Sequence, residues 1–397
     1  MSLPTTLRHA APYIHSHRGK TMVVALSGET SARSDIARLV YDLALVHALG
    51  VRLVVVHGAR PQIEARLRAA GTQSQLHNNL RITDKTQLPL VMEAVGRLRM
   101  ELEALLTTSL NSTPMGGARL DVVGGNLVTA RPLGVRDGVD MQHTGTVRGV
   151  DVPALQDYLA RGSVVLLSNV GYSPTGECFN LSYEEVAIEV AAELRADKLV
   201  FLQPNSQLSA AVVDVADAPA IAQRAIARGV PRVHLVPDHL EGSLLNELYS
   251  REGAGMLVRA QPFEAVRGAQ ESDIGGILAL IEPLQHEGKL VPRTREQLEL
   301  DLEHFVVMQR DGLITACAAL LPYEHTPMGE LACVAVHADY REQGRAQAVL
   351  RAIEQRAKTA GMTQLFALTT HAPHWFIERG FVDADPNILP PKRHYND

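Results

Sequence analysis

The chain has 397 residues, 46% hydrophobic and 21% charged, which is ordinary for a globular protein of two or three domains. Its net charge of -6, without a Lys/Arg block, argues against a nucleic-acid binder. The cysteines Cys178, Cys317 and Cys333 are widely spaced, which argues against disulfides and a zinc site. Neither a signal peptide nor a membrane-length apolar run is visible. We therefore expect a cytoplasmic protein with no metal and no membrane partner.

The first part of the chain alternates buried strands with helices. Residues 1–20 predict an amphipathic arm, and residues 22–26 and 51–56 predict strands that each precede a helix. This order implies an open, mainly parallel α/β sheet with right-handed crossovers. The later predicted elements are a helix over 87–106, a hairpin of 120–123 with 127–130, a ribbon over 133–150, a helix over 152–161, a strand over 164–167, a helix over 183–195, a strand over 198–202, a helix over 217–228, a strand over 233–236 and a helix over 244–249.

A linker over residues 259–265 divides the chain into a first domain, residues 1–258, and a second, smaller α/β domain, residues 266–397. The second domain alternates short apolar runs with helical patterns. Its predicted elements are helices over 274–284 and 295–304, strands over 305–308, 313–321, 331–336 and 365–370, and a helix beginning near 374.

The most informative stretch covers residues 331–347. A V-x-V strand leads into a turn that contains Gly344 and Ala346, and a helical pattern follows. The free N–H groups and positive dipole end of a helix N-terminus attract an anion. Neither small side chain would keep a phosphate from the backbone. Taken alone, such a turn is more often an ordinary strand–helix connection.

The Arg-x-x-Gly-x-Ala spacing of this turn resembles the pyrophosphate loop of the GNAT acetyltransferases. The strand at 365–370 and the segment 374–381, which ends in Gly-Phe, resemble later parts of the same fold. The resemblance implies acetyl-CoA as a co-substrate, with no permanently bound cofactor. Its phosphates would bind the turn, and its thioester the preceding strand. The acetyl-CoA residues implied are Cys333, Val334, Ala335, Val336, Arg341, Glu342, Gln343, Gly344, Arg345 and Ala346.

Residues 1–258 resemble the amino-acid kinase fold, and most closely the acetylglutamate kinases. Gly28 and Gly58 follow the first two strands, where that family binds phosphates. The lysine of the family's first loop is missing here, and Arg60 stands where the backbone should approach a phosphate. Because phosphoryl transfer depends on positioned positive charge, we expect no kinase activity.

The same resemblance implies an arginine-regulated domain. Glu247 could pair with a guanidinium, whereas the alternative is a solvated helix carboxylate whose neighbouring glycines only cap the helix. Relatives of this branch associate through the first domain, which implies a ring-shaped homo-oligomer such as a hexamer. The effector residues implied are Tyr13, Lys198, His234, Glu247, Gly253 and Gly255.

A kinase-like domain followed by a GNAT domain resembles the bacterial N-acetylglutamate synthases. The implied reaction acetylates L-glutamate, the first step of arginine biosynthesis, under feedback inhibition by L-arginine. In this resemblance Glu330 is the general base, Thr369 donates a proton to the CoA thiolate, and Arg293 binds glutamate beside Val291. The plainer alternatives are a strand-end carboxylate, a β-forming threonine and a solvated arginine.

In that family the chain continues beyond the segment near Tyr395 into a strand that supplies an Arg and a Ser to glutamate binding. Here the sequence ends at Asp397. The loss of these contacts would weaken substrate binding unless Lys392, Arg393 or His394 replaces them. The alternative function is therefore a non-catalytic, arginine-binding scaffold.

Overall fold

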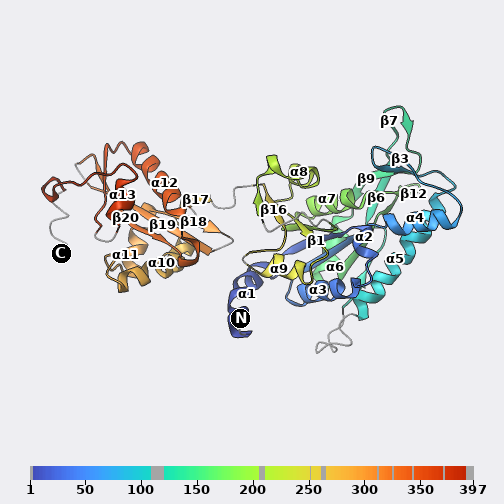
Figure 1. Ribbon diagram of the computed structural model, residues 1–397, viewed down its shortest axis with the longest axis horizontal. Coiled ribbons are helices and arrows are strands. Elements are labelled where there is room, and N and C mark those ends of the chain that lie inside the picture. Colours follow the sequence, from blue (N-terminus) through green and yellow to red (C-terminus); the bar gives the residue numbers. More distant parts are fainter. Residues whose placement is uncertain are drawn as a thin grey trace. The chain divides into compact units, whose positions relative to one another are not determined.

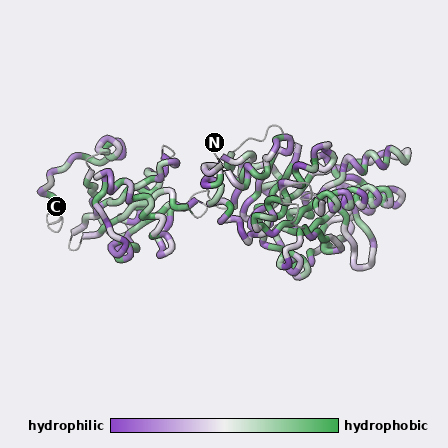
Figure 2. Tube along the Cα trace, turned by 90° about the horizontal axis from the view of Figure 1, so that it is seen from below, coloured by the Kyte–Doolittle hydropathy of each residue, from purple (hydrophilic) through white to green (hydrophobic). Residues whose placement is uncertain are grey.

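The computed structural model divides into two compact units, Met1–Pro262 and Phe263–Asp397 (Figure 1). In each unit the central strands are hydrophobic (Figure 2). Arg259 and Ala265, which we assigned to the linker, are terminal residues of strands in the first and second unit, respectively. The structure describes residues 3–108, 120–204, 211–250, 252–260, 265–310, 313–323, 326–341, 344–369 and 372–389.

An eight-stranded sheet forms the centre of the first unit. Each described neighbouring pair in it is parallel except β15 with β16, so the predicted open, mainly parallel sheet is confirmed. In spatial order the strands are β14 (Ala211–Val213), β16 (Met256–Arg259), β15 (Arg232–Pro237), β13 (Lys198–Gln203), β1 (Thr21–Leu26), β2 (Arg52–His57), β10 (Val164–Ser168) and β5 (Val122–Val123).

Helices cover both faces of this sheet. One core lies between the sheet and α6, α7 and α8, and another lies between the sheet and α3, α4, α5 and α9. The helices of this unit are α1 (Leu3–His17), α2 (Gly28–Ser31), α3 (Ile36–Ala48), α4 (Arg60–Ala69), α5 (Leu88–Thr108), α6 (Val152–Ala160), α7 (Tyr183–Glu193), η1 (Val215–Asp217), α8 (Ala220–Ala227) and α9 (Ser243–Tyr249).

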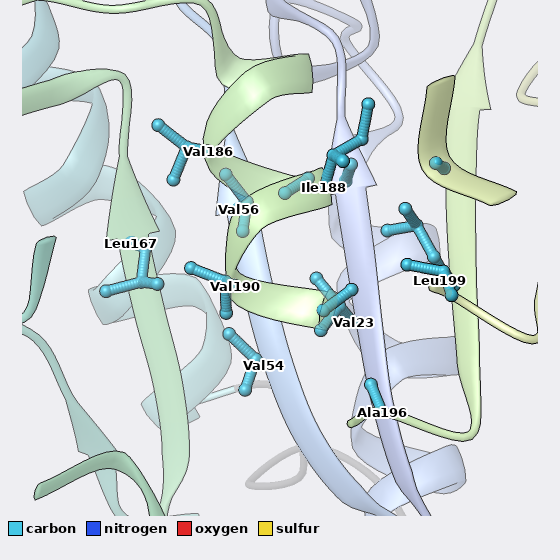
Figure 3. Packing of buried hydrophobic residues seen from close by; sticks show 14 of the residues in the cluster. Val23, Val54, Val56, Leu167, Val186, Ile188, Val190, Ala196 and Leu199 are labelled. Carbon is cyan, nitrogen blue, oxygen red and sulfur yellow. The ribbon is translucent and has the colours of Figure 1, made fainter. Parts of the chain in front are cut away.

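The two cores follow from the alternation of side chains along each strand. On β1, Val23 faces the α7 core, whereas Val24 faces the opposite core. Figure 3 shows Val54 of β2 near Val190 of α7, and Val56 of β2 near Val186. Near-continuous β-branched runs are therefore needed in these strands, because both of their faces are buried.

The predicted hairpin of 120–123 with 127–130 is wrong. β5 pairs in parallel with β10, whereas β6 (Val128–Pro132) belongs to a second sheet. A Cβ atom at Gly124 would lie 2.7 Å from the Leu166 carbonyl oxygen, so this glycine permits a close approach to β10 instead of a tight turn. The other strands outside the large sheet are β9 (Gly145–Val150), β11 (Val170–Tyr172) and β12 (Cys178–Asn180), with the small ribbons β3 (Gln75–His77)–β4 (Leu80–Ile82) and β7 (Val135–Arg136)–β8 (Val139–Asp140).

The second unit is a five-stranded sheet between two helical layers. Its first four strands are antiparallel, β20 and β21 are parallel, and α10 and α11 cover the face opposite α12 and α13 (Figure 1). Its elements are β17 (Ala265–Gly268), η2 (Glu271–Asp273), α10 (Ile274–His286), α11 (Arg295–Leu300), η3 (Leu302–His304), β18 (Phe305–Arg310), β19 (Leu313–Pro322), β20 (Met328–Val336), η4 (Ala338–Tyr340), α12 (Arg345–Thr359), β21 (Gln364–Phe366), α13 (Pro373–Ile377) and η5 (Pro386–Ile388).

Two predicted positions in this unit are corrected. Glu330 lies inside β20 and is only 3% exposed, because Glu330 pairs with Leu321 on one side and Phe366 on the other. Thr369 lies after the end of β21 and not on a strand. Its hydroxyl accepts a hydrogen bond from the Ala372 amide at 3.1 Å, so the side chain stabilises a turn before α13.

Candidate functional site

A cavity of about 790 Å³ in the second unit brings the predicted transferase residues together. Its volume lies in the range of small-molecule sites. Glu342 and Gln343, predicted for the acetyl-CoA loop, lie outside the described residues. The predicted residues that line the cavity are Val291, Arg293, Glu330, Cys333, Val334, Ala335, Val336, Arg341, Gly344, Arg345, Ala346 and Thr369.

A β-bulge interrupts β20 along one wall of this cavity. Ala335 pairs with Cys317 and Ala332 pairs with Ala319, so Cys333 and Val334 together face one residue of β19. Cys333 has a φ of 52°, a strained conformation for a residue with a side chain. A bulge leaves backbone groups outside the regular ladder, where a ligand can use them.

The N-terminus of α12 forms a second wall. Gly344 is the N-cap residue and has a φ of 76°, which favours glycine. Among the described residues, no atom outside its chain neighbours lies within 4 Å of a Cβ atom placed at Gly344. Gly344, Arg345 and Ala346 line the cavity, so the first turn of this 15-residue helix lies at the cavity wall, where helix amides can bind an anion.

Arg345 stabilises this turn through contacts with Tyr340. Its side chain is buried, its Nη1 donates to the Tyr340 carbonyl oxygen at 2.9 Å, and its guanidinium lies 4.8 Å from the centre of the Tyr340 ring. These contacts hold the segment before α12 against the helix. The sequence pattern alone assigned Arg345 to the cofactor without indicating this supporting contact.

Glu330 has a hydrogen-bond partner that the sequence did not indicate. The Tyr323 hydroxyl donates to Glu330 Oε2 at 2.7 Å. Tyr323 follows β19, whereas Glu330 lies in β20, so only the pairing of these strands brings them together. A carboxylate within β20 and at the cavity wall is suited to accept a proton from a bound substrate.

Arg293 is also held by a residue that sequence analysis missed. Its Nη1 donates to Asp301 Oδ2 at 2.5 Å, and its side chain is mostly buried. Arg293 also lies near the Cys333 thiol. Burial raises the pKa of that thiol, and the Arg293 guanidinium partly offsets this effect. Arg293 thus presents a fixed positive charge at the cavity, opposite in sign to a substrate carboxylate.

Aromatic side chains from α13 complete the cavity. Trp375 and Phe376 line it, and their rings pack edge to face with centroids 5.0 Å apart. The Arg379 guanidinium lies 4.2 Å from the centre of the Trp375 ring. The segment 374–381 carried the predicted family signature, but its sequence did not indicate which side chains would face the cavity.

Other kinds of site are not evident in the part of the chain that the structure describes. No cluster of three or more His, Cys, Asp or Glu side chains is arranged to hold a metal ion among those residues. None of the described helices combines the length and apolar character needed to cross a membrane.

In the first unit, the glycines that follow β1 and β2, where the resemblance implied phosphate binding, are tightly packed. A Cβ atom at Gly28 would lie 2.5 Å from the Arg60 backbone nitrogen and 2.6 Å from Pro61 Cδ. One at Gly58 would lie 2.8 Å from Tyr183 Cδ1. These glycines therefore let protein segments pack against each other. A smaller cavity of about 380 Å³ remains beside them.

Several of the predicted effector residues of the first unit lie close to the Glu247 carboxylate. His234 Nδ1 lies 2.5 Å from Glu247 Oε1, and the Ala254 and Gly255 amides each donate to Oε2 at 2.8 Å. Burial lowers the pKa of His234, so its neutral ring donates to the carboxylate. Burial alone would raise the pKa of Glu247, but the hydrogen bonds from His234 and these amides lower it.

Two further predicted effector residues, Lys198 and Gly253, lie near this pair. Lys198 is buried at the start of β13, and its charge opposes protonation of His234. Gly253 adopts a φ of 70°, and a Cβ atom there would lie 2.8 Å from Glu247 Oε2. Tyr13 lies on α1, which contacts α9 through the edge-to-face pair of His17 and Tyr249.

Two family models match the chain. The amino acid kinase family model matches residues 20–205, and the acetyltransferase (GNAT) family model matches residues 276–381. The amino-acid acetyltransferase of Azotobacter vinelandii is 48% identical over 98% of this chain and 94% of its own length. That of Pseudomonas aeruginosa is 47% identical with the same coverage of both chains.

Solved structures agree with these matches. N-acetylglutamate synthase from Neisseria gonorrhoeae, complexed with coenzyme A and L-arginine, has a TM-score of 0.91 and 34% identity, covering 99% of this chain and 96% of that one. The complex of the same enzyme with coenzyme A and N-acetyl-glutamate has a TM-score of 0.63 and 35% identity, covering 99% and 95% of the two chains.

Proposed function

Because the chain belongs to the amino-acid acetyltransferases that join an amino-acid kinase domain to a GNAT domain, we propose that it acetylates L-glutamate. Acetyl-CoA is the co-substrate, and the products are N-acetyl-L-glutamate and CoA. This reaction would be the first step of arginine biosynthesis. The names of the Neisseria gonorrhoeae complexes, which include N-acetyl-glutamate and coenzyme A, support this choice of acceptor.

The observation that carries the proposal is that one cavity is lined by a carboxylate that can act as a base, by a cationic side chain and by a turn that can bind an anion. Glu330, Arg293 and Gly344 all line it. The turn at Gly344 would bind the pyrophosphate of acetyl-CoA. Arg293 would bind a carboxylate of glutamate, which places the substrate nitrogen within reach of Glu330.

The chemistry then needs one acyl transfer and the removal of two protons from the substrate nitrogen. Glu330 takes the first proton from the glutamate ammonium, and the resulting amine attacks the thioester carbonyl carbon. Backbone N–H groups beside the bulge at Cys333 would stabilise the negative charge that forms on the carbonyl oxygen. The carbon–sulfur bond breaks, the nitrogen loses its second proton to solvent as the amide forms, and CoA leaves as a thiolate that takes a proton. Thr369 would orient the sulfur and supply that proton, which then returns from solvent.

Regulation by L-arginine is the second part of the proposal. The Glu247 carboxylate already accepts one hydrogen bond at Oε1 and two at Oε2. A carboxylate oxygen has two lone pairs, so a guanidinium would bind Oε1 through one contact. Tyr13 would cover the ligand, and Gly253 would leave room for it. The first unit would thus be a regulatory domain without kinase activity.

Thiol release from acetyl-CoA tests both parts of the proposal. We expect release that depends on L-glutamate and that L-arginine suppresses. The matched control is Glu247→Gln, which should retain glutamate-dependent release and lose sensitivity to L-arginine. Absence of glutamate-dependent release in the unsubstituted protein would contradict the enzyme assignment, whereas release unaffected by arginine would contradict only the regulation.

A further inference from the structure

We propose that Tyr323 is a positioning residue that orients the Glu330 carboxylate for proton transfer; this inference rests on the proposed role of Glu330 as the base. The Tyr323 hydroxyl donates to Glu330 Oε2 at 2.7 Å, a normal length for a hydrogen bond to a carboxylate. Tyr323 itself need not contact the substrate. Its effect would pass through the base.

Three strands fix the geometry of this contact. Glu330 pairs with Leu321 of β19 and with Phe366 of β21. Tyr323 follows Leu321 by two residues, so its side chain and that of Glu330 lie at the same end of the strand pair. The Phe366 ring lies with its centre 5.7 Å from that of Tyr323 and restricts the orientation of the phenol.

The hydrogen bond restricts the motion of the Glu330 carboxylate. It holds one carboxylate oxygen, so the carboxylate cannot rotate freely about its terminal torsion, which is otherwise broad. A base must be oriented toward the ammonium before it can take a proton, so Tyr323 would increase the fraction of enzyme that is ready to react.

Tyr323→Phe tests this role, because it removes the hydroxyl and keeps the ring that packs against Phe366. We expect kcat to fall about tenfold, since a hydrogen bond to a charged group is lost. The KM for acetyl-CoA should not change. Tyr172→Phe is the matched control, because Tyr172 is exposed in the first unit.

Replacement of Tyr323 by 3-fluorotyrosine provides a second test with the hydroxyl retained. The fluorinated phenol still donates to Glu330, so kcat should stay close to that of the unsubstituted protein. If Tyr323 only packed, neither variant would change kcat. Thermal unfolding of each variant shows whether the fold is intact.

The Glu330→Gln background separates this inference from the proposed function. If Glu330→Gln loses activity and Tyr323→Phe causes no further loss in that background, both residues act in one step. If Glu330→Gln loses activity but Tyr323→Phe leaves kcat unchanged, the role of Tyr323 is overturned while the function stands. Full activity of Glu330→Gln would overturn the assignment of the base, and the role of Tyr323 with it.

Discussion

Two strand-to-helix edges, one in each unit, use glycine in opposite ways. In the first unit Gly28 and Gly58 let Arg60, Pro61 and Tyr183 approach, and protein atoms occupy the space that a side chain would need. In the second unit Gly344 faces open space among the described residues and begins α12. Both edges have the pattern of an anion site, but at the first edge protein atoms fill the space next to the glycines and only a smaller cavity remains.

The two cavities also differ in the charge of the side chains that line them. The described residues that line the second-unit cavity include five basic side chains and one acidic side chain, whereas those of the first-unit cavity include three of each. An excess of positive charge in a cleft favours a polyanion such as acetyl-CoA. The comparison indicates that strand–glycine–helix patterns specify a backbone shape, whereas the surrounding side chains decide whether a phosphate can bind.

The largest expected effect comes from Glu330→Gln, which would break the assignment of chemistry to the second unit if it had no effect. We expect kcat to fall about 10²- to 10⁴-fold, because a carboxamide cannot take the ammonium proton. Thermal stabilisation by L-arginine should persist, since its proposed site lies in the first unit. The two measurements are thiol release and thermal unfolding with and without arginine.

Two buried histidines make the first unit sensitive to acid, whereas Asp42, whose pKa burial raises to about 6, acts in the opposite direction. Burial lowers the pKa of His57 to about 4, from an ordinary value of 6.5, and burial also lowers the pKa of His234. Between pH 6.5 and about 4 the unfolded chain binds protons that the folded one does not, so stability falls as the pH falls. For His57 alone we expect a loss of roughly 3 kcal/mol over this range.

Two optical probes check this acid effect. Trp375 is the single tryptophan, so its fluorescence reports on the second unit, whereas circular dichroism reports on both. Denaturant unfolding at pH 7 and pH 5 should show a destabilised transition by circular dichroism that His57→Gln makes less dependent on pH. An unchanged pH dependence in His57→Gln would contradict the assignment of a buried neutral His57.

A matched pair of glycine substitutions, one in each unit, tests the difference between the two strand-to-helix edges. Gly28→Ala should lower the free energy of unfolding by about 1–3 kcal/mol, because the new methyl group meets the Arg60 backbone. It should leave the KM for acetyl-CoA unchanged. Gly344→Ala should cost only about 1 kcal/mol of stability through its positive φ and should raise that KM. An equal effect of both substitutions on KM would contradict the distinction between the two edges.

The smallest expected effect concerns Arg293, the cationic side chain proposed to bind glutamate. Asp301→Asn weakens the ion pair that holds Arg293, so we expect the KM for glutamate to rise about fivefold with little change in kcat. Arg295→Gln is the control, because Arg295 is exposed and pairs with Glu299 on the same helix. A change in kcat without a change in KM would argue that Arg293 does not bind glutamate.

Local sequence patterns predicted the fold because they reflect interactions between near neighbours. Buried runs such as those of β1 and β2 indicated a parallel sheet, and the turn before α12 indicated an anion site. The hairpin at Gly124 was mispredicted because the same glycine can serve a tight turn or a close approach to another strand. Only the position of Leu166 distinguishes these two uses.

The sequence by itself determined the two-domain α/β class, the turn at Gly344 and the residue types of the proposed base and the proposed substrate-binding cation. The tertiary structure decided what surrounds them. It brought Tyr323 into hydrogen-bond contact with Glu330 and Asp301 into hydrogen-bond contact with Arg293, and it packed Tyr183 against Gly58. Strand pairing and side-chain packing join residues that are distant along the chain, and no local pattern records which of them will meet.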